Sequence, residues 1–207
     1  MHPARAFHET DLEAVATLVA ERPLAVICGV SGGRALVAHA PVLLGDNRLR
    51  FHLSAANPLA AALAQSPRAL AVVTSDDVYI SPDWYGAPDQ VPTWNYLSAE
   101  IEGPVRILAV DEAVRLLDDL SARHEANLAP KPPWTRDKMT PARFEALLAG
   151  IVAYEMTIER IEGITKLSQN KTPAEIKRVA AALQALPNES GRRLAARMLT
   201  PPPASPR

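Results

Sequence analysis

Cysteine is nearly absent from this sequence. Its single cysteine, Cys28, cannot form a disulfide within the chain, and no Cys-x-x-Cys pair is present. These absences exclude the small secreted folds that disulfides hold together, and they exclude the usual zinc ribbon. Cys28 lies in an apolar stretch, where a free cysteine usually packs as a small hydrophobic residue. We therefore expect an inert, buried thiol.

Glycine is also scarce, with 9 residues in a chain of 207. No Gly-x-Gly-x-x-Gly or Walker-type loop is present, which excludes the usual phosphate-cradling motifs, and no Gly-x-Ser-x-Gly nucleophile elbow is present. The five histidines form no pair at helical spacing with a carboxylate, so we expect no metal site. The chain is nevertheless long enough to bury a substantial core, and its apolar content of 48% is that of a globular protein.

Long hydrophobic runs are missing as well. The longest, 24–30 and 69–73, have the length of a strand, whereas a membrane span needs about 18 or more consecutive apolar residues. The start of the chain lacks the apolar stretch of a signal peptide. We therefore expect a cytoplasmic protein that makes no contact with a membrane.

The net charge of −1 hides an uneven distribution. Residues 164–207 contain eight basic and two acidic side chains, whereas residues 1–163 contain 14 basic and 21 acidic ones. Such asymmetry is typical of a surface that meets an anion or a nucleic acid. The alternative is a basic segment that packs on an acidic body, and charge alone does not decide between the two.

Hydrophobic spacing and turn signals predict the elements. Strands are expected at 24–30, 34–44, 48–53, 68–74, 98–110 and 151–158. Helices are expected at 11–22, 58–65, 111–124, 141–148, 173–186 and 190–199. Gly103-Pro104 indicates a bulge or bend. The strands come in hairpin-linked runs with helices between them, which predicts an α+β fold built on an antiparallel barrel with peripheral helices.

Two polar clusters lie on predicted strands. The first is His39, within Ala-His-Ala-Pro, which alone is more typical of a satisfied structural histidine. In the second, a strand containing His52 leads directly into a helix capped by Asn57. The amides of a first helical turn attract anions, and Ser54 and Asn57 could add donors. The alternative is an ordinary capped helix.

Two further clusters follow. Five of the ten aromatic residues lie between residues 79 and 96, where the proline-containing loop 81–93 is expected. Aromatic side chains gathered in a loop need a partner chain, a flat ligand or the protein body to cover them. The segment 166–171, Lys-Leu-Ser-Gln-Asn-Lys, is rich in hydrogen-bond donors and suits an anionic polar ligand, unless it is a solvated linker.

Taken in order, these stretches resemble the PaiB-type family of FMN-binding negative transcriptional regulators. The resemblance extends from about residue 1 to about residue 197, and its most specific marks are Val-Pro-Thr-Trp-Asn-Tyr at 91–96 and Lys-Leu-Ser-Gln-Asn at 166–170. It implies an FMN-binding split β-barrel, the fold of pyridoxamine phosphate oxidases, and a homodimer with FMN at the subunit interface. It also implies a repressor of sporulation and degradative-enzyme genes.

The resemblance also implies a domain division and a cofactor site. The split barrel would occupy residues 1–163 and a basic helical extension residues 164–200, whereas the proline-rich composition of residues 201–207 predicts a disordered tail. The residues that the resemblance places around FMN are His39, His52, Ser54, Asn57, Ser81, Trp94, Asn95, Tyr96, Lys166, Gln169 and Asn170.

One position departs from the family pattern. Where many members have Ala-Arg before Ala-Asn-Pro, this sequence has Ser54-Ala55. An arginine at position 55 could pair with the FMN phosphate, and its absence would cost about 1.5–3 kcal/mol, or roughly 10- to 100-fold in affinity.

Three functions follow from these observations. A flavin-binding regulator that uses its basic C-terminal region to contact DNA or a protein partner is the first. A flavin-dependent oxidoreductase is the second, with His39 and His52 as acid–base candidates. A non-redox module for another flat, anionic ligand is the third, and Ala55 favours it.

Overall fold

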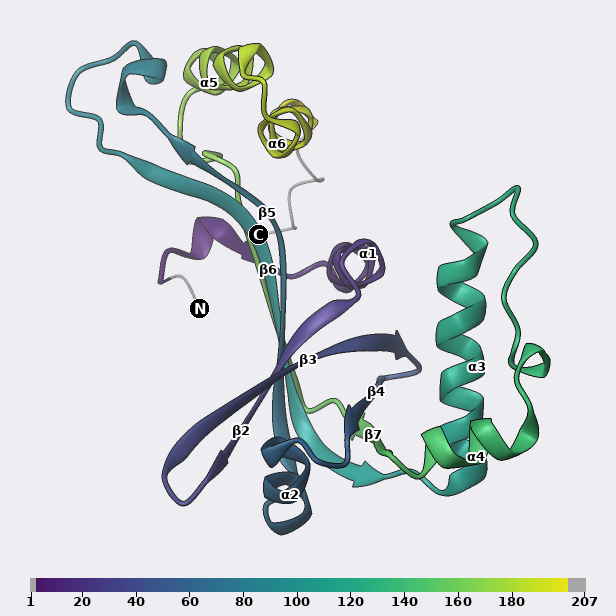
Figure 1. The fold of residues 1–207 in the computed structure, drawn as a ribbon. Coiled ribbons are helices and arrows are strands. Elements are labelled where there is room, and N and C mark those ends of the chain that lie inside the picture. Colours follow the sequence, from purple (N-terminus) through teal and green to yellow (C-terminus); the bar gives the residue numbers. More distant parts are fainter. Residues whose placement is uncertain (1–2, 201–207) are drawn as a thin grey trace. The chain divides into compact units, whose positions relative to one another are not determined.

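The computed structural model describes residues 3–200, so the predicted tail at 201–207 lies outside the described residues. Within that range the chain forms eight strands and six α-helices, with three short 3-10 helices (Figure 1). The strands are β1 His8–Glu9, β2 Leu24–Ser31, β3 Arg34–Gly45, β4 Arg48–Ser54, β5 Arg68–Ile80, β6 Thr93–Ile107, β7 Ile151–Thr157 and β8 Arg160–Lys166. The helices are η1 Arg5–Phe7, α1 Leu12–Glu21, α2 Pro58–Gln65, η2 Pro82–Tyr85, α3 Val110–Ala126, η3 Arg136–Lys138, α4 Pro141–Leu148, α5 Pro173–Ala185 and α6 Glu189–Leu199.

The predicted helices and hairpins are confirmed, and the strands differ from the expected ones in their bounds and in their number. β5 continues to Ile80 and β6 begins at Thr93, so both strands extend into the segment expected to be a loop. β6 ends at Ile107, before the expected residue 110, and neither β1 nor β8 is among the expected strands. In β6 the burial alternates residue by residue although Gly, Pro and charged residues interrupt the sequence pattern.

The chain divides into two compact units, and four elements pass from one unit to the other. The barrel unit comprises residues 19–73 and 100–161, and the hairpin unit comprises residues 3–18, 74–99 and 162–200. Helix α1 and the strands β5, β6 and β8 each contribute residues to both. The units therefore interleave along the sequence, and the predicted division at residue 163 stays a prediction.

The barrel unit is built on a ring of strands. The order β6-β5-β2-β3-β4-β7 closes through a further pairing between β6 and β7. Val105 pairs with Met156 in this antiparallel closing ladder. Residues that point into the ring are apolar, and Phe51 stacks on Tyr154 with 5.2 Å between ring centroids. Alternation along each strand thus buries one face and leaves the other for helices or solvent.

Gly103 has a packing role in the closure of this ring. A Cβ atom at this position would lie 1.9 Å from the carbonyl oxygen of Thr157 and 3.0 Å from its carbonyl carbon. Backbone atoms cannot move aside as a flexible side chain can, so only glycine fits. The predicted irregularity at Gly103-Pro104 is a close approach of two backbones, within a strand that continues through it.

Helix α3 packs on the outside of the barrel unit. Leu116 and Leu120 of α3 form a buried cluster with Leu43 and Ala153. At the start of the helix, Arg106 forms hydrogen bonds with the carboxylate of Glu112 at 2.8 Å, and the pairing lowers the pKa of Glu112 to about 2. Helix α4, which follows after an irregular stretch, has no buried residue.

The hairpin unit has strand order β1-β8-β6-β5, with helices near the η2 tip. Helices α5 and α6 pack on each other, and α5 also contacts η2 (Figure 1). Thr172 and Glu175 form a capping box at the start of α5, as the sequence predicts. None of the helices within residues 3–200 combines the length and apolar character that a membrane crossing needs.

Candidate functional site

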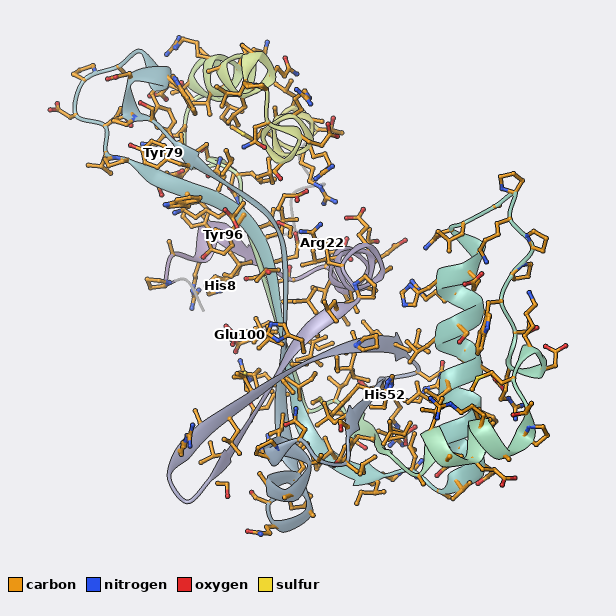
Figure 2. All side chains as sticks on the ribbon, viewed as in Figure 1. His8, Arg22, His52, Tyr79, Tyr96 and Glu100 are labelled. Carbon is orange, nitrogen blue, oxygen red and sulfur yellow. The ribbon has the colours of Figure 1, made fainter. Side chains whose placement is uncertain are left out.

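The strand β4 leads directly into α2 and presents polar side chains on its outer face. Leu49, Phe51 and Leu53 point inward and are buried, so His52 and Ser54 point outward. Figure 2 shows His52 directed from β4 toward α3. The alternation that buries the apolar half of this strand is therefore what places His52 beneath a helix.

The side chain of His52 is not fully satisfied by hydrogen bonds within the described residues. Its Nδ1 atom is buried and has no hydrogen-bond partner, the one such side-chain atom among the described residues. Burial lowers the pKa of His52, which favours the neutral ring. Buried polar atoms are nearly always satisfied, so an orphaned nitrogen indicates a missing partner.

A hollow of about 290 Å³ adjoins His52. We call it the His52 hollow, and it is lined by Pro41, His52, Leu117, Leu120, Ser121, His124, Glu125 and Trp134. The hydroxyl of Ser121 has no hydrogen-bond partner within residues 3–200. A hollow with apolar and aromatic walls and a few polar groups is typical of a ligand site.

The predicted anion seat at the start of α2 has a specific limitation. The amides of residues 55–57 donate to Gly150, to the Ser54 hydroxyl and to the Ser54 carbonyl, respectively. The Leu59 amide donates to the Asn57 side chain at 2.9 Å, and Pro58 has no N–H group. The first-turn amides that would attract a phosphate thus already have acceptors inside the chain.

Two side-chain donors remain at this helix start. The Ser54 oxygen accepts a hydrogen bond from Ala56, which leaves its own hydrogen free to donate. Asn57 uses its Oδ1 atom as the cap, and its Nδ2 group has no partner within the described residues. Ala55 is exposed between them and offers no charge. His39 is also exposed, on the outer face of β3.

The two most specific motifs meet in the interior of the hairpin unit. Asn95 is completely buried, and its Nδ2 atom donates to the Ser168 hydroxyl at 3.0 Å. The Tyr85 hydroxyl lies 3.1 Å from the same Ser168 oxygen, and Asn95 Nδ2 also lies 3.6 Å from the Met198 sulfur. These side chains tie β6, η2, the 166–170 segment and α6 together.

The neighbouring motif residues are also engaged within the chain. Lys166 donates to the Thr93 hydroxyl at 2.6 Å and lies over the Phe7 ring. Gln169 donates to the carbonyls of Ala6 and Thr165 and accepts from the Leu167 amide. The segment 166–169 therefore stabilises the fold through its own hydrogen bonds. Burial also lowers the pKa of Lys166. Asn170 is exposed and has no partner within the described residues.

The aromatic residues of the hairpin divide between core and surface. Tyr85 is buried, whereas Trp94 is 52% exposed and Tyr79 is 45% exposed. The exposed pair makes an edge-to-face contact with 6.1 Å between ring centroids. Tyr96 lies on the same face of β6 as Trp94 and is half-buried, and Ser81 precedes η2 without capping it.

The eleven predicted site residues therefore fall into two groups. His39, His52, Ser54 and Asn57 lie in the barrel unit, and the other seven lie in the hairpin unit. Sequence reasoning did not find Ser121 or Trp134, which border the His52 hollow. The only signal was a tryptophan in an irregular, proline-rich stretch. Within residues 3–200 no group of three or more His, Cys, Asp or Glu side chains could hold a metal ion.

The residues around His52 fit a flat, polar cofactor such as a flavin. The buried Nδ1 atom of His52 lacks a donor, and Trp134 offers an aromatic wall. The Ser54 hydroxyl, at the end of the same strand, and the Asn57 side-chain amide, just after it, are donors that have no acceptor within the described residues. The fit is weaker for a doubly charged phosphate, since no basic side chain stands between residues 54 and 60.

Two curated relatives align with most of this chain. Protease synthase and sporulation protein PAI 2 of Bacillus subtilis (strain 168) is 27% identical over 201 residues, which are 94% of this chain and 95% of the relative. An uncharacterized protein of Emericella nidulans is 25% identical over 181 residues, 73% of this chain and 72% of that protein.

Solved structures show the same fold, the flavin-binding split β-barrel. The FAD and heme binding protein of Mycobacterium smegmatis superposes with a TM-score of 0.60 at 22% identity, covering 84% of this chain and 79% of that one. The flavocytochrome Anf3 of Azotobacter vinelandii superposes with a TM-score of 0.57 at 16% identity, covering 80% and 72%.

The sequence itself settles the family. Residues 1–160 match the family described as "Putative FMN-binding domain", and this match supports FMN as the cofactor. It agrees with the PaiB-type resemblance and with the alignment to the Bacillus relative. The chain belongs to this FMN-binding domain family.

Proposed function

We propose that this protein is an FMN-binding regulator that uses the flavin to sense redox or metabolic state. The observation that carries the proposal is the orphaned Nδ1 atom of His52 at the edge of an aromatic-walled hollow. Bound FMN would supply reversible electron transfer. The chain's part is to hold and orient the group, with His52 as a hydrogen-bonding partner and Ser54 and Asn57 as neutral donors.

The hairpin unit contributes a second group of residues to the proposal. Trp94 and Tyr96 share one face of β6, and the half-exposed Tyr79–Trp94 pair needs a cover. We assign that cover to a homodimer in which FMN lies at the subunit interface, with Ser81 and Asn170 nearby. Asn95, Lys166 and Gln169 would support this face from behind, because their polar groups are engaged within the chain.

Regulation of gene expression is the finer part of the proposal. The Bacillus relative is named for protease synthesis and sporulation, and eight basic residues occur at 164–207. Several of them hold the fold: Arg193 pairs with Asp76 at 2.7 Å, and Arg178 donates to the Tyr85 carbonyl at 2.7 Å. Lys177 on α5 is exposed and has no partner within residues 3–200. DNA contact is therefore assigned to the α5–α6 surface around it.

The proposal is tested on purified full-length protein by titration with FMN. We expect a flavin absorption band that stays with the protein through gel filtration, at the mass of a dimer. A retarded complex with promoter DNA should weaken steeply as salt rises, since phosphate contacts release counterions. No complex at low salt would contradict direct DNA binding without affecting the flavin result.

Two other outcomes would replace the proposal. Protein that remains colourless in excess FMN would favour a non-redox binding module, because Ala55 provides no cation for the phosphate of FMN. Oxidation of NADH or NADPH well above the rate with free flavin would identify a flavin-dependent oxidoreductase.

A further inference from the structure

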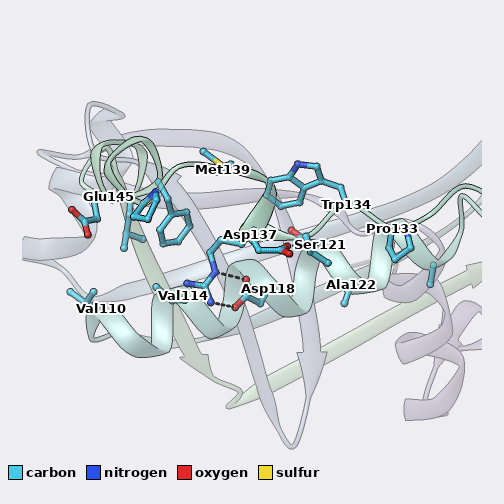
Figure 3. A pocket seen from close by; sticks show the side chains of 16 residues that line it. Val110, Val114, Asp118, Ser121, Ala122, Pro133, Trp134, Asp137, Met139 and Glu145 are labelled. Atoms are coloured by element: carbon cyan, nitrogen blue, oxygen red, sulfur yellow. Dashed lines mark hydrogen bonds and ion pairs between the residues drawn. The ribbon is translucent and has the colours of Figure 1, made fainter.

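A second and larger pocket lies between α3 and α4 in the barrel unit. Its volume is about 1010 Å³, which is at the upper end of the range for ligand sites. Figure 3 shows Val110 and Glu145 at one end and Pro133 and Trp134 toward the other. Because no residue of α4 is buried, the helix forms an apolar wall without closing over it.

The aromatic walls of this pocket already accept a positive charge. The Arg136 guanidinium lies 5.0 Å from the centroid of the Phe144 ring, a cation–π arrangement. Its Nε and Nη2 atoms donate to the two carboxylate oxygens of Asp118 at 3.1 and 3.0 Å. Trp134, on the same pocket, has no cation or ring contact within the described residues.

The charges of the lining do not balance. Asp118 is neutralised by Arg136, the only basic residue among the sixteen that line the pocket. Asp137 accepts a hydrogen bond from the Thr135 hydroxyl and Glu145 is exposed, and neither carboxylate forms an ion pair within residues 3–200. The pocket thus combines apolar walls, an open tryptophan face and two uncompensated negative charges.

From this complementarity we propose that the α3–α4 pocket binds a hydrophobic organic cation, an aromatic or bulky apolar body with one positive charge. The apolar body would pack on Val114, Phe144 and Trp134, and the positive charge would be attracted by Asp137 and Glu145. This assignment is independent of the flavin. It places a small-molecule effector site beside the His52 hollow, because Trp134 and Ser121 border both.

A pair of ions with the same shape and opposite charge tests the proposal. Tetraphenylphosphonium and tetraphenylborate are titrated separately into full-length protein without FMN. In a background that carries Trp84→Phe and Trp94→Phe, Trp134 is the only tryptophan, so its fluorescence reports the pocket itself. We expect saturable quenching by the cation, weaker binding as salt rises, and at least tenfold weaker binding of the anion.

Substitutions then locate the site. Ala122→Phe, at an exposed lining position on α3, places a bulky ring in the pocket and should strongly weaken the quenching, while Trp134 remains the only tryptophan. Asp137→Asn with Glu145→Gln should weaken the cation about three- to tenfold, the range for two screened surface charges. Asp46→Asn with Glu13→Gln removes two exposed charges outside the pocket and should change nothing.

Three results would overturn the assignment: equal binding of the two ions, cation binding that Ala122→Phe does not weaken, or equal loss in the two charge variants. Circular dichroism of each variant verifies that it is folded. FMN binding is read separately from visible absorption, so loss of the flavin proposal would leave the cation result unchanged, and the reverse also holds.

Discussion

The polar residues of the two units are used in opposite ways. In the hairpin unit, Asn95 and Ser168 bond to each other, and Lys166 and Gln169 bond to backbone and hydroxyl groups nearby. In the barrel unit, the buried nitrogen of His52 has no partner. The donor-rich segment of the hairpin unit stabilises the fold. In the barrel unit, His52 keeps a hydrogen-bonding atom that a ligand could use.

This contrast separates two readings of a specific motif. A motif can be distinctive because it contacts a ligand, or because a buried polar network tolerates few alternatives. The 91–96 and 166–170 stretches meet through Asn95 and Ser168, which supports the second explanation for those two residues. If so, substitutions of Asn95 or Ser168 should lower stability, and substitutions around His52 should alter flavin affinity.

The largest change in FMN affinity is expected from introducing a basic side chain into the barrel unit. Ala55→Arg should raise FMN affinity about 10- to 100-fold, the value of a charge-assisted bond of 1.5–3 kcal/mol. Ala55 is exposed, so the longer side chain has room. The dissociation constant is measured from quenching of flavin fluorescence.

Ala64→Arg is the matched control, because it adds the same charge at an exposed position near the other end of α2. Equal gains in both variants would indicate a general charge effect, and no gain at position 55 would place the phosphate elsewhere.

Asn95→Ala should mainly affect the hairpin unit. Removing the buried amide leaves the Ser168 hydroxyl with one partner fewer, at a cost of about 1–3 kcal/mol of unfolding free energy. FMN affinity of the folded variant should stay within about twofold. Denaturant unfolding and flavin titration measure the two quantities on one preparation.

Asn170→Ala provides the comparison within the same motif. This asparagine is exposed, so its truncation should change the unfolding free energy by less than about 0.5 kcal/mol. A loss of FMN affinity with Asn95→Ala at unchanged stability would place that amide at the cofactor instead of in the core.

His52→Phe should show the opposite pattern. Flavin affinity should fall about 2- to 12-fold, the worth of a hydrogen bond of 0.5–1.5 kcal/mol. Stability should not fall, because phenylalanine removes an unsatisfied buried nitrogen. His52→Asn, which keeps a polar side chain, should recover part of the affinity; a drop in melting temperature with either variant would assign His52 a structural role.

Local patterns predicted much of the fold, but they missed what depends on distant partners. Alternating apolar residues and capping signals located β4, α2 and α5, because each depends on neighbours in sequence. β8 and the extension of β5 to Ile80 were missed because pairing with other strands outweighs their mixed composition.

The candidate site shows the same limit. His52 was identified from its position before a capped helix, and its outward direction follows from the alternation of β4. Ser121 and Trp134 were not identified, since α3 and the irregular stretch after it bring them to His52 from about seventy and eighty residues away in sequence. The hydrogen bond from the Ala55 amide, just before α2, to the Gly150 carbonyl is equally invisible in sequence.

The smallest expected effect is a pH dependence that originates in the barrel unit. Burial lowers the pKa of His52 in the folded protein, so below the usual value of about 6.5 the unfolded chain binds more protons at this residue. Its contribution to stability is therefore complete above that value and declines as the pH falls toward the folded pKa. The effect is modest because the side chain is only partly buried.

Thermal unfolding of the wild type and His52→Phe between pH 7.5 and 5 measures this contribution. The wild type should lose more stability than the variant on acidification. His124 and Glu125 line the same hollow and are present in both proteins, so their titration largely cancels in the difference. Parallel pH profiles would mean that the imidazole titrates alike in the folded and unfolded chains, and that the contrast between the two units does not extend to proton binding.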